Sequence, residues 1–319
     1  MKIFVDFPVS GRALDVLQGG TAGHELIFAR KPATSVLAEV EIDPAFAAAE
    51  VAVGQPDPAA IAGAKRLKWV QVSSSGFTRY DTAEFRELVQ SRGIAVTHSA
   101  GVYAEACAVH VLSFLLAQVR GLPLALASAA GNGSADWKDL RARSSTLSGE
   151  RVLILGFGSI GRKLAERLAP FGAEVTAFRR RERGTEGIEV RTDLLPALAG
   201  ADHVVNILPG SSQTDGLIDS EKFSAMKDGA AFYNIGRGST VDQAALLAAL
   251  ESGRLRAAWL DVTTPEPLAT NHPLRAVENC YITPHLAGGH GDEALSLIRH
   301  FVANFQRFVA GEELAERIM

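Results

Sequence analysis

The sequence predicts an α/β protein built on parallel β-sheets with helices on their faces. Short apolar runs suited to buried strands alternate with helix-like segments along most of the chain, the pattern of a parallel sheet covered by helices. Near the middle of the chain, a glycine-rich turn joins one such run to an amphipathic helix. The length of 319 residues is sufficient for two domains of ordinary size, each with its own core.

Composition and charge are typical of a soluble globular protein. Hydrophobic residues make up 47% and charged residues 21% of the chain, so disorder is not expected. The net charge of -4 argues against a nucleic-acid partner, for which a basic face is expected. Cys107 and Cys280 lie far apart, outside any metal-binding or disulfide pattern. The N-terminal run lacks the features of a signal peptide, so we expect a cytoplasmic protein without membrane or metal partners.

The first hundred residues contain strand patterns at 3–5, 25–28, 51–53, 69–72 and 94–97. A short helix is expected between residues 39 and 53, and the prolines at 56 and 58 mark a turn into another helix. The strand at 69–72 runs into Ser73, Ser74, Ser75 and Gly76, small residues whose backbone amides can face an anion. From spacing alone, this turn is either an anion site or a simple strand-to-helix connection.

Residues 104–119 are apolar nearly all round, which is typical of a helix buried in protein or in a membrane. Glu105, His110 and the modest length favour burial in protein, and we expect this helix to bridge two domains. The stretch from 120 to 150 is less regular. We expect Trp137 within it to pack in a core rather than to serve a site.

Residues 151–181 form a strand, helix, strand unit with the glycine-rich turn at its first joint. The strand expected at 152–155 is followed by Gly156, Gly158 and Gly161 at G-x-G-x-x-G spacing. The first glycine permits a tight bend, the second lets a pyrophosphate approach the backbone, and the third allows close helix packing. The helix start presents unpaired N–H groups to an anion, and a second strand is expected at 174–178. This context favours a dinucleotide-binding unit over a glycine turn that only packs.

The end of that second strand predicts the type of dinucleotide. An NAD site carries Asp or Glu about 20 residues past the glycines, where it accepts hydrogen bonds from the ribose hydroxyls. Here the candidate positions hold Phe178, Arg179, Arg180 and Arg181, with Arg183 close behind. A guanidinium cannot accept a hydrogen bond, but it binds a phosphate through two parallel donors. We therefore expect NADP (NADPH) rather than NAD; the alternative is that these arginines form a solvated strand edge.

Four further strands are expected at 203–208, 230–234, 257–262 and 280–283, which makes six in the nucleotide-binding sheet. Ligands of open parallel sheets collect at the carboxyl ends of the strands. The polar residues that follow the last three of these strands are Arg237, then Asp261 and Glu266, then His285.

These strand-end residues have the chemistry that carbonyl reduction needs. A carboxylate beside a histidine stabilises the imidazolium and orients the ring, so Glu266 and His285 can act as an acid/base pair. Such a pair can protonate the oxyanion left by hydride transfer. Arg237, between two glycines, can bind a substrate carboxylate through two hydrogen bonds. Singly, each residue also suits a structural role, as a core histidine, a turn residue or a surface cation; together they favour a site.

The motifs resemble the signature set of the D-isomer-specific 2-hydroxyacid dehydrogenases. The similar segments are GFGSIG at 156–161, NIGRG at 234–238, LDVTTPEPL at 260–268 and TPHLAGG at 283–289. The likeness extends weakly through the N-terminal segment. The arginines, which stand where many members have Asp, and the small SSSG turn are most similar to the NADPH-dependent glyoxylate/hydroxypyruvate reductase branch.

The resemblance implies a role for each residue of the site. His285 is the implied proton donor and acceptor, Glu266 its partner, and Asp261 the residue that holds the nicotinamide carboxamide. The residues implied to bind substrate are Ser74, Ser75, Gly76, Arg237 and His285. Those implied or expected to bind the cofactor are Gly156, Phe157, Gly158, Ser159, Ile160, Gly161, Arg179, Arg180, Leu208, Pro209, Ile235, Gly236 and Asp261.

The resemblance also implies two Rossmann-like or flavodoxin-like domains, the nucleotide-binding domain being inserted into the substrate domain. The expected domains are 99–285 for the dinucleotide, and 1–98 with 286–319 for the substrate. The implied activity is hydride transfer between NADPH and a 2-ketoacid to give a D-2-hydroxyacid, in a homodimer. One alternative is an NAD(P)-sensing, corepressor-like binding protein of the same fold, and another is an NAD-preferring, phosphoglycerate-type dehydrogenase. The complete set of Arg237, Glu266 and His285 argues for an enzyme.

Overall fold

The computed structural model describes residues 1–32, 41–131, 133, 135–182, 184 and 187–319. The chain divides into two compact units, which are described separately. The terminal unit comprises Met1–Tyr103 and Gly289–Met319, and the central unit comprises Ala104–Gly288. These divisions fall within a few residues of the expected domain boundaries.

The terminal unit contains a sheet of five parallel strands in the order β2-β1-β3-β4-β5. The strands are β1 (Lys2–Asp6), β2 (Glu25–Phe28), β3 (Val51–Gly54), β4 (Trp69–Val72) and β5 (Ala95–Thr97). Each coincides with an expected strand to within one residue at either end. Strands β3, β4 and β5 are buried along their whole length, which explains why their sequences are almost purely apolar.

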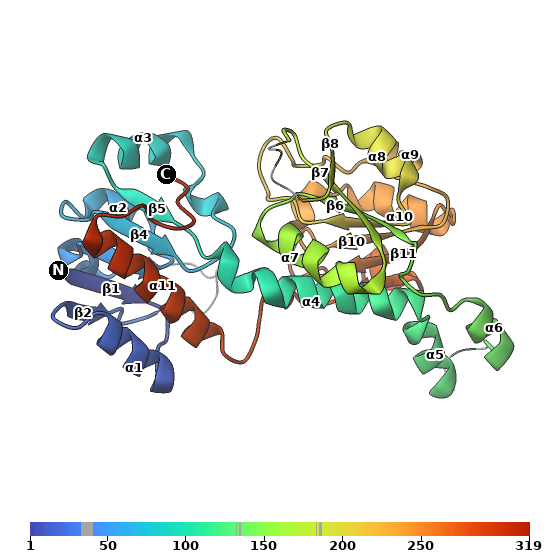
Figure 1. Ribbon diagram of the computed structural model, residues 1–319, viewed down its shortest axis with the longest axis horizontal. Coiled ribbons are helices and arrows are strands. Elements are labelled where there is room, and N and C mark those ends of the chain that lie inside the picture. Colours follow the sequence, from blue (N-terminus) through green and yellow to red (C-terminus); the bar gives the residue numbers. More distant parts are fainter. Residues whose placement is uncertain (33–40, 132, 134, 183, 185–186) are drawn as a thin grey trace. The chain divides into compact units, whose positions relative to one another are not determined.

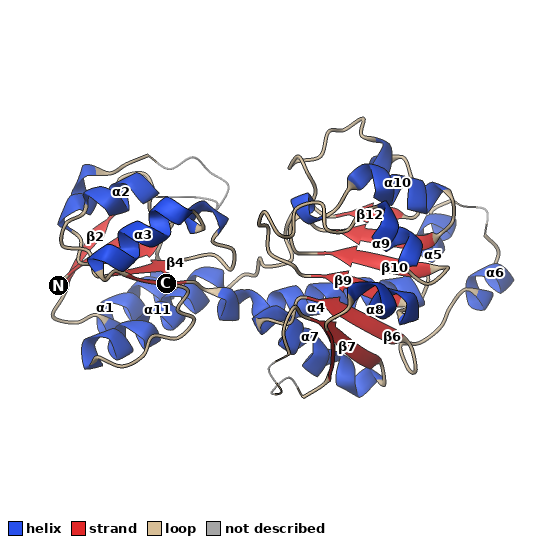
Figure 2. Cartoon of the chain, turned by 90° about the horizontal axis from the view of Figure 1, so that it is seen from above, coloured by secondary structure: helices blue, strands red, loops and turns tan. Residues whose placement is uncertain are grey.

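Helices cover both faces of this sheet (Figures 1 and 2). One face carries α1 (Gly11–Gly20) and α11 (Glu293–Ala310), and the other carries α2 (Pro58–Gly63) and α3 (Ala83–Arg92). The short helix expected between residues 39 and 53 is a 3-10 helix, Pro44–Ala48, capped by the Asp43 carboxylate, which accepts a hydrogen bond from the Ala45 amide. Residues 39 and 40 lie outside the described part of the chain.

The central unit contains a sheet of seven parallel strands in the order β12-β11-β10-β9-β6-β7-β8. The strands are β6 (Arg151–Leu155), β7 (Glu174–Phe178), β8 (Glu189–Arg191), β9 (His203–Asn206), β10 (Ala230–Asn234), β11 (Leu255–Leu260) and β12 (Cys280–Ile282). The prediction of six strands is therefore wrong by one, because β8 was not anticipated. This edge strand has only three residues, none of them buried, and its sequence Glu-Val-Arg contains no apolar run.

Helices also cover both faces of the central sheet (Figure 2). Helices α8 (Leu194–Gly200), α9 (Ser220–Ala225) and α10 (Gln243–Glu251) enclose one core, and α7 (Ser159–Leu168) lies on the other face. Helix α4 (Ala100–Val119) begins in the terminal unit and continues into the central unit, as expected of a bridging helix.

The expectation that α4 is buried on all sides is wrong. The helix has the length and hydropathy of a membrane span, but Ala108, Val111 and Leu115 are fully buried in this protein. On its other side the Val109 side chain is 44% exposed. Helix α4 is therefore exposed along one side, which carries Glu105, Val109 and Ser113.

The segment after α4 forms two short helices, α5 (Leu122–Ala129) and α6 (Trp137–Ala142), that sequence patterns did not predict. In Figure 1 they extend away from the sheet of the central unit, and neither contains a buried residue. Trp137 is 71% exposed, with the Arg141 guanidinium 4.7 Å from its ring centroid. The prediction that Trp137 packs in a core is therefore wrong.

Candidate active site

The glycine-rich turn lies at the point where the strand order of the central sheet reverses. It leaves β6, whose neighbours are β7 on one side and β9 on the other, so the chain runs outward in both directions from here. Gly156 adopts φ +96°, and a Cβ there would lie 3.2 Å from the Ile207 carbonyl oxygen beyond β9. The turn therefore packs closely against the residues that follow the neighbouring strand β9.

The other two glycines of the motif differ in what surrounds them. A Cβ on Gly161 would lie 2.6 Å from the Gly156 carbonyl oxygen and 3.2 Å from the Phe157 ring, so a side chain would push α7 off the turn. A Cβ on Gly158 would meet nothing within 4 Å. Gly158 is the exposed N-cap of α7, and as a glycine it has no side chain that could cap the helix. An open approach to an uncapped helix start fits a dinucleotide pyrophosphate.

The end of β7 presents guanidinium groups, as expected. Arg179 follows the last strand residue and is half-buried, whereas Arg180 and Arg181 are exposed. The Arg180 guanidinium donates a hydrogen bond to the Gln213 side-chain oxygen, a partner that no sequence pattern indicated. Arg183 lies outside the described residues.

Two buried asparagines organise the exits of β9 and β10, where Leu208, Pro209, Ile235 and Gly236 were expected to bind the cofactor. The Asn206 amide donates to the Asn234 side-chain oxygen at 3.1 Å and to the Thr240 hydroxyl at 2.7 Å. Their oxygens accept from the backbone amides of Leu208 and Gly236 at 3.2 and 3.1 Å. Sequence reasoning missed both asparagines because it considered the residues after each strand, and these are the last residues within the strands.

Arg237 lies in the loop after β10, held against the backbone. A Cβ on the following residue, Gly238, would lie 2.0 Å from the Thr263 carbonyl oxygen, so only glycine fits there. The Arg237 Nη1 donates to the Gly236 carbonyl at 2.7 Å, and no described residue accepts from Nε or Nη2. Burial lowers the pKa of this half-buried guanidinium, and the Glu266 carboxylate opposes that shift. One edge of the guanidinium therefore has two donors for a planar anion.

Glu266 and His285 form the pair that the strand ends predicted. His285 Nδ1 lies 3.0 Å from Glu266 Oε1, and the two side chains are 29% and 26% exposed. Within the described part of the chain Nδ1 has no well-aligned hydrogen bond, but it is the ring nitrogen that faces the carboxylate. Because Nδ1 faces the carboxylate, Nε2 is the nitrogen that can reach a reacting group.

The Asp261 carboxylate fixes the loop that carries His285. It is buried and accepts hydrogen bonds from the Thr283 hydroxyl at 2.6 Å and from the Leu286 and Ala287 amides, both at 2.9 Å. His285 has φ 51°, an unusual value for a residue other than glycine. These bonds hold that conformation, and the expected contact of Asp261 with a nicotinamide stays a prediction.

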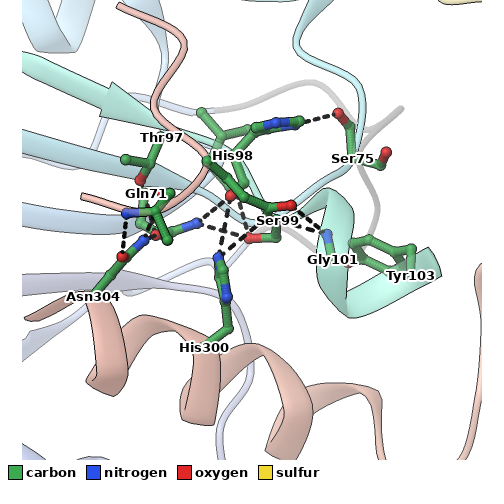
Figure 3. Close-up of polar contacts among 12 residues, drawn as sticks. Gln71, Ser75, Thr97, His98, Ser99, Gly101, Tyr103, His300 and Asn304 are labelled. Carbon is green, nitrogen blue, oxygen red and sulfur yellow. Dashed lines mark hydrogen bonds and ion pairs between the residues drawn. The ribbon is translucent and has the colours of Figure 1, made fainter. Parts of the chain in front are cut away.

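In the terminal unit, residues 73–76 form a compact turn after β4, here called the serine turn. The Gln55 side-chain amide donates to the hydroxyls of Ser73 and Ser74 at 3.2 and 2.8 Å. Among the described residues, none accepts a hydrogen bond from the backbone amides of Ser75 or Gly76. Figure 3 shows the His98 ring directed at Ser75. Free amides of this kind suit an anion, and the binding of a substrate anion at this turn stays a prediction.

The described residues contain no cluster of three or more His, Cys, Asp or Glu side chains that could hold a metal ion.

Comparison with known proteins gives consistent matches. Residues 112–287 match the family model "D-isomer specific 2-hydroxyacid dehydrogenase, NAD binding domain". The chain is 37% identical over 229 residues to human glyoxylate reductase/hydroxypyruvate reductase, which covers 70% of this chain and 69% of that enzyme. It is 34% identical over 233 residues to D-3-phosphoglycerate dehydrogenase of Mycobacterium tuberculosis, covering 72% of this chain and 43% of that enzyme.

Among solved structures, a D-isomer specific 2-hydroxyacid dehydrogenase from Xanthobacter autotrophicus Py2, crystallised with NADPH and MES, is 28% identical in sequence. The superposition covers 100% of this chain and 97% of that one, with a TM-score of 0.80. The fold of two parallel-sheet units is therefore one already known.

Proposed function

The chain belongs to the D-isomer specific 2-hydroxyacid dehydrogenase family, and from this premise we propose that it reduces small 2-ketoacids such as glyoxylate and hydroxypyruvate to D-2-hydroxyacids with NADPH. The observation that carries the proposal is the grouping of Arg237, Glu266 and His285 beyond three adjacent strands, β10, β11 and β12. The human relative bears the name of this activity.

Each residue has a task in this reaction. A bound nicotinamide supplies the hydride that reaches the carbonyl carbon. The two free donors of Arg237 bind the substrate carboxylate and the carbonyl oxygen. As negative charge develops on that oxygen, His285 donates the Nε2 proton to it, and Glu266 stabilises and orients the imidazolium. Proton donation by a positioned histidine contributes about 10² to 10⁴-fold in rate.

The test of this function is a substrate panel followed by NADPH absorbance at 340 nm. We expect turnover of glyoxylate and hydroxypyruvate, with pyruvate and phenylpyruvate as probes of side-chain size. Absence of turnover with all four 2-ketoacids contradicts the proposal. Binding of NADPH without turnover is the outcome expected of a nucleotide sensor, and oxidation of 3-phosphoglycerate with NAD is that expected of a phosphoglycerate dehydrogenase.

Preference for NADPH is proposed from the arginines after β7, because Arg179, Arg180 and Arg181 occupy the positions where an NAD site has a carboxylate that accepts bonds from the ribose 2′-hydroxyl. Replacing Arg179 with Asp removes a phosphate donor and adds a repelling charge. We expect the ratio of kcat/KM with NADPH to kcat/KM with NADH to fall by about tenfold or more. The loss of one charge-assisted hydrogen bond to the phosphate is enough to weaken NADPH binding by that factor. Initial rates with each cofactor measure the ratio.

The control for Arg179→Asp is Arg12→Asp, the same charge reversal at an exposed position of α1 in the terminal unit. It should leave the cofactor ratio unchanged. A clear preference of the unmodified protein for NADH, or equal ratios in both variants, contradicts the assignment of NADP.

We also propose a homodimer in the cytoplasm. Cys107 and Cys280 are both free, as suits a reducing compartment. Helices α4, α5 and α6 carry four large apolar side chains that the central unit leaves exposed, namely Val109, Leu122, Leu126 and Trp137. A second copy of this chain is the occupant we propose, because exposed apolar side chains at this density are covered in stable assemblies.

Introducing lysine at both Leu122 and Leu126, which are 46% and 68% exposed and one turn apart on α5, is expected to convert the dimer to a monomer. Two charges cannot be desolvated in an apolar interface without partners. Size-exclusion chromatography with light scattering gives the mass. Ile42→Lys, at a 53% exposed position of the terminal unit, is the matched control and should remain dimeric. A monomeric unmodified protein contradicts the proposal.

A further inference from the structure

The last residues of the chain extend the sheet of the terminal unit beside the serine turn. Strand β5 is at the edge of the sheet, and residues 315–319, the C-terminal segment, pair with it in antiparallel fashion. The Ile318 amide donates to the Val96 carbonyl at 2.9 Å, and the His98 amide donates to the Glu316 carbonyl at 3.2 Å. The segment thus reaches residues 98–101, which lead from β5 into the first two residues of α4. We call these four residues the connection.

Glu316 fixes this connection through its side chain as well. Its two carboxylate oxygens lie 2.8 and 3.1 Å from the Gly101 amide, which donates to them, and Oε2 lies 3.4 Å from His300 Nε2. The same His300 nitrogen lies 3.3 Å from the His98 carbonyl oxygen, which also accepts a hydrogen bond from the Gln71 side-chain Nε2 at 2.7 Å. Glu316 adopts φ 55°, a strained value outside glycine, so these contacts hold the backbone there at an energetic cost.

The connection in turn holds the carbonyl groups of the serine turn (Figure 3). His98 Nδ1 lies 2.9 Å from the Ser75 carbonyl oxygen, and the Ser99 amide donates to the Ser74 carbonyl oxygen at 3.0 Å. Because a carbonyl oxygen only accepts, Nδ1 is the protonated ring nitrogen of His98. Both carbonyl groups are therefore turned towards the connection.

The direction of these carbonyl groups determines where the free amides point. In a planar trans peptide the N–H points opposite to the C=O of the same unit. Fixing the Ser74 carbonyl therefore aims the Ser75 N–H away from the connection, and fixing the Ser75 carbonyl does the same for the Gly76 N–H. No described residue accepts a hydrogen bond from either of these two amides.

We propose that His98 is a positioning residue for the substrate carboxylate, and that Glu316 and His300 hold His98 in place. The inference rests on the proposed function and adds to it one role that the family resemblance implies, namely that the amides of Ser75 and Gly76 also bind the carboxylate of the 2-ketoacid. Hydrogen bonds to this carboxylate are present in the ground state and the transition state alike. Loss of the positioning residue therefore raises KM and leaves kcat unchanged.

The test compares His98→Leu with His98→Asn. The asparagine amide nitrogen occupies the position of Nδ1, three bonds from Cα, whereas leucine has the same shape without a donor. We expect His98→Leu to raise the KM for hydroxypyruvate, and the Kd of oxamate for the NADPH complex, by about tenfold. The kcat and the Kd of NADPH should stay within about twofold of the unmodified values. His98→Asn should restore both KM and the oxamate Kd.

A second pair of variants tests the C-terminal segment. Glu316→Gln keeps the acceptor for Gly101 but removes the charge that faces His300, so we expect a smaller rise in the KM and in the oxamate Kd, about threefold. Glu313→Gln, with the same loss of charge at an exposed side chain, should match the unmodified protein.

Equal effects of His98→Leu and His98→Asn overturn the proposal. So does a joint fall of kcat, NADPH affinity and melting temperature in His98→Leu, which indicates a structural role. An unmodified protein that neither turns over 2-ketoacids nor binds oxamate shows that the proposed function itself is wrong. An active protein whose oxamate Kd is the same in all four variants shows that the positioning role alone is wrong.

Discussion

Replacing His285 with Ala is expected to lower kcat by about 10² to 10⁴-fold, the range typical of a general acid. The ring that donates the proton is lost, and Glu266, its neighbour at 3.0 Å, cannot replace it because an ionised carboxylate carries no proton. The Kd of NADPH should stay within about twofold, since proton donation does not contribute to cofactor binding. Steady-state rates and a fluorescence titration with NADPH measure the two quantities.

The control for His285→Ala is His290→Ala, an exposed histidine five residues further along the chain. It should retain the rate of the unmodified protein. Loss of both turnover and NADPH binding in His285→Ala points to a structural role, and an unchanged kcat removes His285 from the mechanism. Glu266→Gln keeps the size of the side chain but removes its charge, so we expect a smaller fall in kcat.

Replacing Arg237 with Lys is expected to lower kcat/KM by about 10² to 10⁴-fold. Lysine keeps the positive charge, but it cannot reproduce the two parallel donors of Nε and Nη2. Two charge-assisted hydrogen bonds of about 1.5 to 3 kcal/mol each account for this range. Kinetics with hydroxypyruvate at saturating NADPH measure the effect. Arg143→Lys, at an exposed position just after α6, is the matched control; a near-normal kcat/KM in Arg237→Lys contradicts the assignment.

The sequence was most informative about functional residues that lie directly after a strand. Arg237, Glu266 and His285 each follow a buried apolar run, and parallel strands bring their carboxyl ends to one edge of the sheet. The contact of Glu266 with His285 was therefore predictable from strand order alone. The glycine turn was predictable for the same reason, because its spacing directly follows β6 and opens α7.

Other features depend on contacts between distant parts of the chain, which leave no local pattern. The bond from His98 to Ser75 and the approach of Glu316 to Gly101 join segments that lie far apart in sequence. Strand β8 is too short and too polar for a hydrophobic pattern to reveal it. Trp137 was expected in a core because aromatic residues usually are buried, but its short helix contains no buried residue.

The most direct test of the central claim is the identity of the product formed from hydroxypyruvate and NADPH by the purified protein. We expect one equivalent of NADPH to be consumed for each glycerate formed, and chiral chromatography to find the D-enantiomer. Consumption of NADPH without glycerate, or formation of L-glycerate, contradicts the claim.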